Sequence, residues 1–210
     1  MHPIGPTHRP ARIIPKHYAQ GLVILLSLVS CSTVEQEDKK YPVGQIRTPH
    51  GEMLFWLYDE TPGHKKSFIE LASEHYWDTY TINRVVKDFV IQGGCPDTPE
   101  GFGDSPYLLE PEFVDDIRHI YGAVGAGRDD NPQKLSAGCQ LYIVQNREGI
   151  SRLDGNYTIF GQIFKGFDVL ELIAGVETDS HDTPLVDVSL DVNVVYLTKE
   201  ELGKYGYEVH

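Results

Sequence analysis

The stretch TINRVVKDFVIQGG, residues 81–94, decides the fold of this chain. Apolar side chains alternate with polar ones on both sides of a charged pair, which is typical of two short antiparallel strands, here Thr81–Val86 and Phe89–Gln92. Similar runs, separated by Gly, Pro, Asn and Asp, extend in both directions along the chain. The pattern therefore predicts a domain built mainly from short antiparallel strands.

Two helices are expected among these strands. Thr61 and Pro62 open a helical stretch that continues through about Tyr76, and Thr61 is suited to cap its first turn. Phe167–Ala174 has the apolar spacing of a second, shorter helix. The remaining strands are expected at Gln45–Arg47, Glu52–Tyr58, Gly122–Ala126, Gln140–Gln145, Phe160–Phe164 and Val186–Leu197. Two helices among roughly eight strands predict a fold dominated by β structure, a closed antiparallel β-barrel capped by two α-helices.

The composition is that of an ordinary globular protein. Of 210 residues, 40% are hydrophobic and 23% are charged, so we expect one folded domain, residues 41–198, followed by a C-terminal tail, residues 199–210. The formal net charge is -13, and no run of Lys and Arg is longer than a pair. Nucleic acid is excluded as a partner because it requires a basic face. No metal-ligand pairing of histidines is present, so we expect no metal and no cofactor.

The first 40 residues have the organisation of an export signal followed by a tether. A basic start leads into the apolar run Leu22–Leu28, and a small residue precedes Cys31. This run is too short for a bilayer span, which needs about 20 apolar residues. The tetrad LVSC, ending at Cys31, resembles the lipobox of bacterial lipoproteins and implies lipidation of Cys31. Residues 1–31 are therefore expected to be a lipoprotein signal peptide, and the polar residues 32–40 a disordered tether.

Four motifs follow one another in a fixed order along the rest of the chain. Arg84, Phe89 and a Gln-Gly-Gly sequence mark the first, SAGCQLYI (residues 136–143) is the second, LDGNYTIFG (residues 153–161) is the third, and the helix start at Phe167 is the fourth. Together they resemble the cyclophilin family of peptidyl-prolyl cis-trans isomerases over about residues 41–198. The resemblance implies an eight-stranded antiparallel barrel with a helix at each end and a proline-binding groove on its outside.

The resemblance assigns the central catalytic role to Arg84. Rotation about an amide is opposed by about 18–20 kcal/mol because the nitrogen lone pair is delocalised. A guanidinium that donates to the prolyl nitrogen only in the twisted state lowers this barrier without covalent chemistry. The implied catalytic residues are Arg84, Gln92 and Phe89. The implied substrate-binding groups are the side chains of Val90, Gln140, Tyr142, Leu153 and Tyr157 and the backbone of Ala126 and Gly127.

The implied substrates are proline-containing segments of exported or envelope proteins. The lipid anchor would be the protein's only contact with a bacterial envelope membrane, and the domain, expected to be a monomer, would lie in the periplasm or at the cell surface. Two other functions stay open, a non-catalytic chaperone or peptide-binding scaffold and a lipocalin-like carrier with an open apolar lumen.

Two positions depart from the family pattern. Arg152 stands about where many eukaryotic cyclophilins have a tryptophan that contacts cyclosporin, so we expect weak cyclosporin binding. Tyr157 stands where the family often has a histidine. A tyrosine hydroxyl can still donate to a substrate carbonyl, so this role survives the change.

The two remaining cysteines, Cys95 and Cys139, leave two alternatives. In an exported protein, two thiols that remain after lipidation invite a disulfide. They could equally be free, partly buried thiols that only pack. A Cα separation beyond about 7 Å would exclude the bridge. A cysteine hydrolase would need a histidine and an orienting partner beside one thiol, and the spacing of His119 gives no support for it.

Overall fold

Antiparallel strands form the main sheet of the structure, a computed structural model that describes residues 38–95 and 108–209. In these residues the sheet has nine strands in the order β10-β3-β4-β8-β6-β9-β2-β1-β11. Their bounds are Lys40–Thr48 (β1), Gly51–Leu57 (β2), Thr81–Val86 (β3), Val90–Gly94 (β4), Ala123–Ala126 (β6), Gln140–Val144 (β8), Ile159–Lys165 (β9), Val188–Ser189 (β10) and Asp191–Thr198 (β11). Two shorter strands, Leu108–Leu109 (β5) and Ser136–Ala137 (β7), pair with each other.

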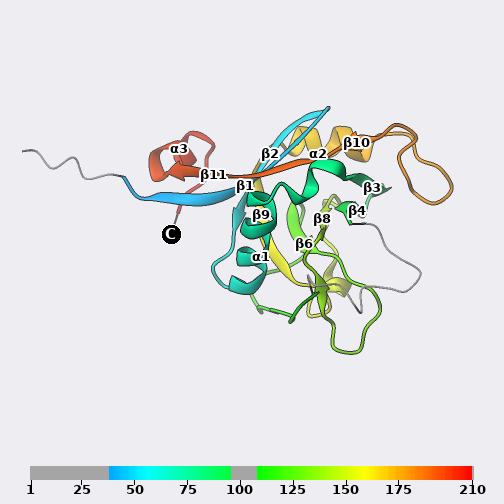
Figure 1. Ribbon diagram of the computed structural model, residues 1–210, viewed down its shortest axis with the longest axis horizontal. Helices are drawn as coiled ribbons and strands as arrows, with labels where there is room; N and C mark the ends of the chain where they lie inside the picture. The colour runs from blue at the N-terminus through cyan, green and yellow to red at the C-terminus, as the bar shows by residue number, and fades with distance from the viewer. Residues whose placement is uncertain (1–37, 96–107, 210) are drawn as a thin grey trace, which may run out of the picture. The chain divides into compact units, whose positions relative to one another are not determined.

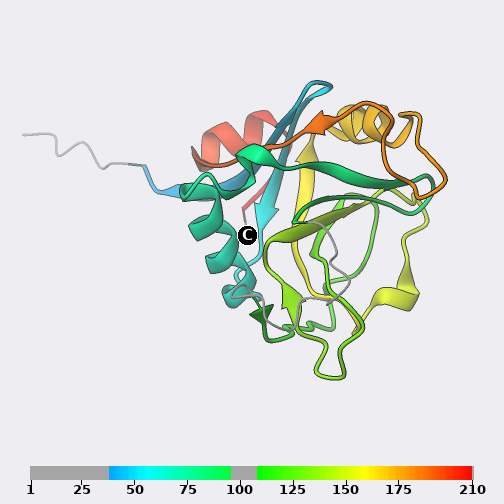
Figure 2. The same cartoon turned by 45° about the vertical axis from the view of Figure 1, so that its right-hand side comes forward.

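The strands at the two ends of this order, β10 and β11, are consecutive in the chain. Only Leu190 separates them, and its backbone N–H donates to the Tyr80 carbonyl at 3.0 Å. Because β10 pairs with β3 and β11 pairs with β1, one extended segment borders both ends of the curled sheet (Figure 2). With β10 and β11 counted as one strand, the described residues form the eight-stranded antiparallel barrel that the sequence predicts.

Two main helices pack on this sheet (Figure 1). The first, α1 (Pro62–Ser73), contacts β11, and the second, α2 (Phe167–Ala174), contacts β2, β3 and β4. The sequence predicts the bounds of α2 correctly. However, α1 ends before Tyr76, because His75 adopts a left-handed backbone conformation (φ 56°) and a short 3₁₀ turn follows. Among the described residues, no helix combines the length and apolar character that crossing a membrane requires.

The N-terminus of α1 is capped by a distant carboxylate. The hydroxyl of Thr61 makes no capping hydrogen bond, although Thr61 occupies the N-cap position. The Glu112 carboxylate accepts instead from the backbone N–H groups of Gly63 and His64, each at 2.9 Å. One of its oxygens also lies 2.7 Å from Nδ1 of His64. The expectation that Thr61 caps this helix is therefore wrong, because a charged acceptor satisfies the free donors and interacts favourably with the helix dipole.

The interior of the barrel is filled with apolar side chains. Those of Phe55, Ile91, Leu141 and Ile143 are at most 1% exposed and belong to one continuous core. Since alternate residues of a strand face opposite sides of a sheet, the neighbours of Leu141 and Ile143 on β8 face outward from this core. A barrel whose interior is occupied by its own side chains contradicts the lipocalin-like alternative.

The described unit begins with a strand of the sheet and ends with a helix and a short segment that pack on the barrel. β1 begins at Lys40, the last residue of the expected tether, whereas Cys31 and the rest of the signal peptide lie outside the described residues. At the other end, Lys199–Lys204 forms a third helix, α3, which starts with a capping box. Beyond α3, Tyr207 stacks on Trp56 with ring centres 5.1 Å apart. Within the predicted tail, Leu202, Tyr207 and Val209 thus pack against the barrel.

Candidate active site

A concavity of about 260 Å³ on the outside of the barrel brings together nearly all of the predicted site residues. It is lined by Arg84, Phe89, Val90, Gln92, Gly127, Arg128, Gln140, Tyr142, Arg152, Leu153 and Tyr157. Every predicted catalytic and substrate-binding residue except Ala126 is in this set. Arg128 and Arg152 line the concavity in addition to the predicted residues.

Ala126 faces the barrel core. Its side chain is 2% exposed within the central apolar cluster, and its N–H donates to the Thr158 carbonyl at 3.1 Å. The neighbouring Gly127 does line the concavity, but its N–H donates to the Gln140 carbonyl (2.9 Å) and its carbonyl accepts from Ala137 (2.8 Å). The side chain of Ala126 therefore lies outside the groove, and the N–H and carbonyl groups of Gly127 have partners within the protein.

The pairing of β3 with β4 holds Arg84 beside Gln92, its partner in the strand register. Nη1 of Arg84 donates to Oε1 of Gln92 at 3.3 Å, and the guanidinium carbon lies 5.9 Å from the centre of the Phe89 ring. Nε of Arg84 lies 4.0 Å from a carboxylate oxygen of Asp182. Both members of that ion pair are partly exposed, so it orients the guanidinium more than it stabilises the fold. Among the described residues, no hydrogen bond or ion pair involves Nη2 of Arg84, so this group can donate to a ligand.

An apolar floor lies beside this guanidinium. Val90, Tyr142 and Leu153 are 9% exposed or less and pack with Phe89 and Tyr157 in one cluster. The rings of Tyr142 and Tyr157 meet edge to face, with centres 6.1 Å apart. Concave sites lined by apolar and aromatic groups, with a few directed polar groups, are typical of small-ligand binding. The arrangement can hold a small apolar ring against a hydrogen-bond donor.

The floor is supported by a buried chain of hydrogen bonds that the sequence analysis missed. The hydroxyl of Tyr142 lies 2.7 Å from Nε2 of His119, and Nδ1 of His119 lies 2.7 Å from the Asp154 carboxylate. Burial lowers the pKa of His119, although Asp154 opposes this effect, and burial raises the pKa of Tyr142. Both side chains are thus neutral at pH 7, so Nδ1–H donates to Asp154 and Nε2 accepts from Tyr142. No spacing rule connects these three residues in the sequence.

A disulfide joins Cys95, which follows β4, to Cys139, which precedes β8. The two Cα atoms are 5.5 Å apart, within the range that a bridge requires. Nε2 of Gln140 donates to the Cys95 carbonyl at 3.0 Å, so the segment that carries the bridge also positions Gln140 at the edge of the concavity. Of the two alternatives for these cysteines, the structure has the bridge, and neither sulfur is available as a hydrolytic nucleophile. Among the described residues, no group of His, Cys, Asp and Glu is arranged to hold a metal ion.

The outer face of the antiparallel barrel thus carries a concavity that combines the Arg84 guanidinium, the Gln92 side-chain amide and an apolar floor. The family described as "Cyclophilin type peptidyl-prolyl cis-trans isomerase/CLD" matches residues 43–194. This match covers most of the chain and all of the strands from β2 to β10. The chain therefore belongs to the cyclophilin-type peptidyl-prolyl cis-trans isomerase family.

Individual relatives agree with this assignment. A Streptococcus pyogenes protein named "Putative bifunctional phosphatase/peptidyl-prolyl cis-trans isomerase" is 32% identical over an alignment of 193 residues. The alignment covers 78% of this chain and only 40% of that protein. A peptidyl-prolyl cis-trans isomerase of Arabidopsis thaliana is 32% identical over an alignment of 139 residues, which covers 63% of this chain and 80% of that protein. The crystal structure of a Cryptosporidium parvum cyclophilin-type isomerase, determined in the presence of the dipeptide Ala-Pro, has the same fold. Its TM-score is 0.65 at 22% identity, over 74% of this chain and 99% of that one.

Proposed function

We propose that this chain isomerises X-Pro bonds in exported or envelope proteins, and that Arg84 stabilises the twisted amide. The observation that carries this proposal is the convergence of Arg84, Gln92 and Phe89 with an apolar floor on one outward concavity. A scaffold that only binds peptides would need the apolar floor. It would not need the Arg84 guanidinium that the Gln92 side chain holds at the edge of that floor. The proposal therefore favours turnover over simple peptide binding.

The chemistry follows from the positions of these groups. The floor formed by Val90, Tyr142 and Leu153 holds the prolyl ring while the preceding carbonyl rotates. As the amide twists, its nitrogen becomes pyramidal and regains a lone pair that can accept a hydrogen bond. Arg84 donates to this lone pair, while Gln92 keeps the guanidinium in place. Since a planar amide offers no such acceptor, the interaction strengthens only in the transition state and increases the rate.

Arg84→Ala tests the proposal in a protease-coupled assay on a proline-containing peptide. Loss of a transition-state donor is expected to lower kcat/KM by about 100-fold. Arg47→Ala is the matched control, because Arg47 is an exposed arginine of β1 that pairs with Asp191 away from the concavity. It is expected to retain wild-type activity. Equal rates for wild type and Arg84→Ala would reject the isomerase mechanism and favour the scaffold.

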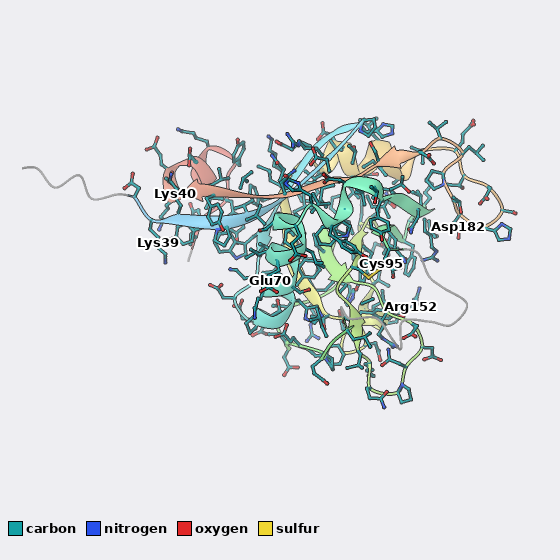
Figure 3. All side chains as sticks on the ribbon, viewed as in Figure 1. Lys39, Lys40, Glu70, Cys95, Arg152 and Asp182 are labelled. Carbon is teal, nitrogen blue, oxygen red and sulfur yellow. A yellow bond between two sulfur atoms is a disulfide. The ribbon has the colours of Figure 1, made fainter. Side chains whose placement is uncertain are left out.

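We also propose that Cys31 is lipidated and that the domain works on the outer side of a bacterial membrane. The disulfide supports this location, because such bridges persist in oxidising compartments. Lys39 and Lys40, where the chain enters the described unit, lie at the opposite end of this unit from Arg152, which lines the concavity (Figure 3). Within the described unit, the point of chain entry is therefore separate from the groove.

The anchor is tested by expressing the full chain in bacteria with labelled palmitate. Wild type is expected to incorporate label and to sediment with membranes, whereas Cys31→Ala is expected to do neither. Label in Cys31→Ala, or a wild-type protein found without label in the soluble fraction, would reject the anchor.

A further inference from the structure

We propose that the groove selects substrates that carry a glutamate or aspartate next to the proline, and that Arg152 binds this carboxylate. The inference rests on the proposed function, since it assigns a substrate class to the same site. It concerns a residue that the mechanism does not otherwise use. Arg152 belongs to the 3₁₀ turn Ser151–Leu153, and its neighbour Leu153 is part of the apolar floor.

The charge of the groove contrasts with that of the chain. The chain carries 31 acidic and 18 basic residues, for a net charge of -13. Nevertheless, the described residues that line the concavity include three arginines, Arg84, Arg128 and Arg152, and no aspartate or glutamate. A local positive potential in an acidic protein attracts anionic groups to that place and disfavours cationic ones.

Two of these guanidiniums lie against the same ring. The guanidinium carbon of Arg152 is 4.9 Å from the centre of the Phe89 ring, and that of Arg84 is 5.9 Å from it. Packing on an aromatic ring holds a guanidinium in place and leaves its N–H groups available for a planar carboxylate. Arg84 already has Gln92 and Asp182 as neighbours. By contrast, no ion pair or side-chain hydrogen bond joins the Arg152 guanidinium to a described residue, so Arg152 is the better anchor.

Space for a flanking side chain lies directly beside the groove. A second, shallower concavity of about 630 Å³ shares Arg84, Phe89 and Arg152 with the first. Its other lining residues are Val86, Asp88, Asn146, Gly149, Ile150 and Ser151. Adjacent residues of a peptide are only about 3.8 Å apart at their Cα atoms. A proline ring on the floor beside Leu153 therefore places its neighbour within reach of Arg152. Asp88 on the wall of the second concavity repels a carboxylate, so the attraction depends on Arg152.

The test compares peptides that differ only in one residue beside the proline. Glutamate, glutamine or lysine is placed immediately before or immediately after proline, and kcat/KM is obtained from NMR exchange between the cis and trans forms. For wild type, glutamate is expected to exceed lysine by about two- to fivefold in at least one position, as for a partly exposed ion pair. Arg152→Gln should bring this ratio close to one, and Arg152→Glu should reverse it.

Arg47→Gln is the matched control, because it removes the same charge from β1 and should leave the ratio at the wild-type value. The ratio separates selectivity from any general loss of activity in the variants. A wild-type ratio of one at both positions, or a ratio that Arg152→Gln and Arg152→Glu do not change, would overturn the inference. Failure of the proposed function is recognised separately, because Arg84→Ala would then turn over the glutamine peptide as fast as wild type.

Discussion

Tyr142→Phe isolates the buried chain of hydrogen bonds beneath the groove. The substitution removes one hydroxyl and leaves the ring of the floor in place, but it deprives Nε2 of His119 of its donor. Tyr142 and His119 are 5% and 2% exposed, so water cannot easily replace the lost partner. Leaving a buried acceptor unpaired costs about 1–3 kcal/mol. For a unit of this size, about 2 kcal/mol corresponds to a decrease in Tm of roughly 4–8 °C.

Calorimetry or circular dichroism on the purified domain measures this decrease. Tyr157→Phe is the matched control, since it removes a hydroxyl from the same concavity, and no hydrogen bond from that hydroxyl to a described residue is present. Its Tm is expected to stay within about 1 °C of the wild-type value, because the change leaves no buried polar group without a hydrogen-bond partner. If Tyr142→Phe and Tyr157→Phe unfold at the same temperature, the hydrogen bond to His119 does not support the floor.

Three further outcomes are expected. Glu112→Ala should lower the free energy of unfolding by about 1–2 kcal/mol, because α1 loses its cap, and an unchanged urea midpoint would contradict this role. Reduction of the Cys95–Cys139 bridge, which closes a loop with a sequence separation of 44, should lower the free energy of unfolding by about 4 kcal/mol. Equal urea midpoints with and without dithiothreitol would refute this stabilising effect. The free energy of unfolding should decrease from about pH 7.5 to about pH 5, because burial lowers the pKa of His64 and His119 below their values in the unfolded chain. The unfolded chain then binds more protons than the folded one in this range. A free energy of unfolding that does not change with pH would contradict this role of the two histidines.

Local patterns in the sequence were sufficient to predict most strands of the barrel. Alternation on Gln140–Val144 correctly separates the outward Gln140 and Tyr142 from the core residues Leu141 and Ile143. The bounds of β3 and α2 agree with the predicted ones, because each segment has a clear period and a clear break at both ends. Charge, turn residues and the hydrophobic period each depend on residues close together in the chain, so they can be identified in a single sequence.

The parts that the sequence could not predict depend on distant partners or on irregular backbone. Glu112 caps α1, and Asp154 orients His119, from positions that no spacing rule connects. The pairing of β6 with β9 shifts register between Val124 and Gly125, which disturbs the simple alternation of faces next to Ala126. Such shifts are set by the neighbouring strand and are not visible in the segment itself.

The pairing of β1 with β11 determines when the sheet can close during synthesis. β1 contributes the earliest strand of the described residues and pairs with β11, the last one, so residue 198 must have left the ribosome before the sheet can close. Contacts between segments so far apart in sequence form slowly. In a nascent chain, the edge of the sheet at β1 therefore stays unpaired with β11 until late in synthesis.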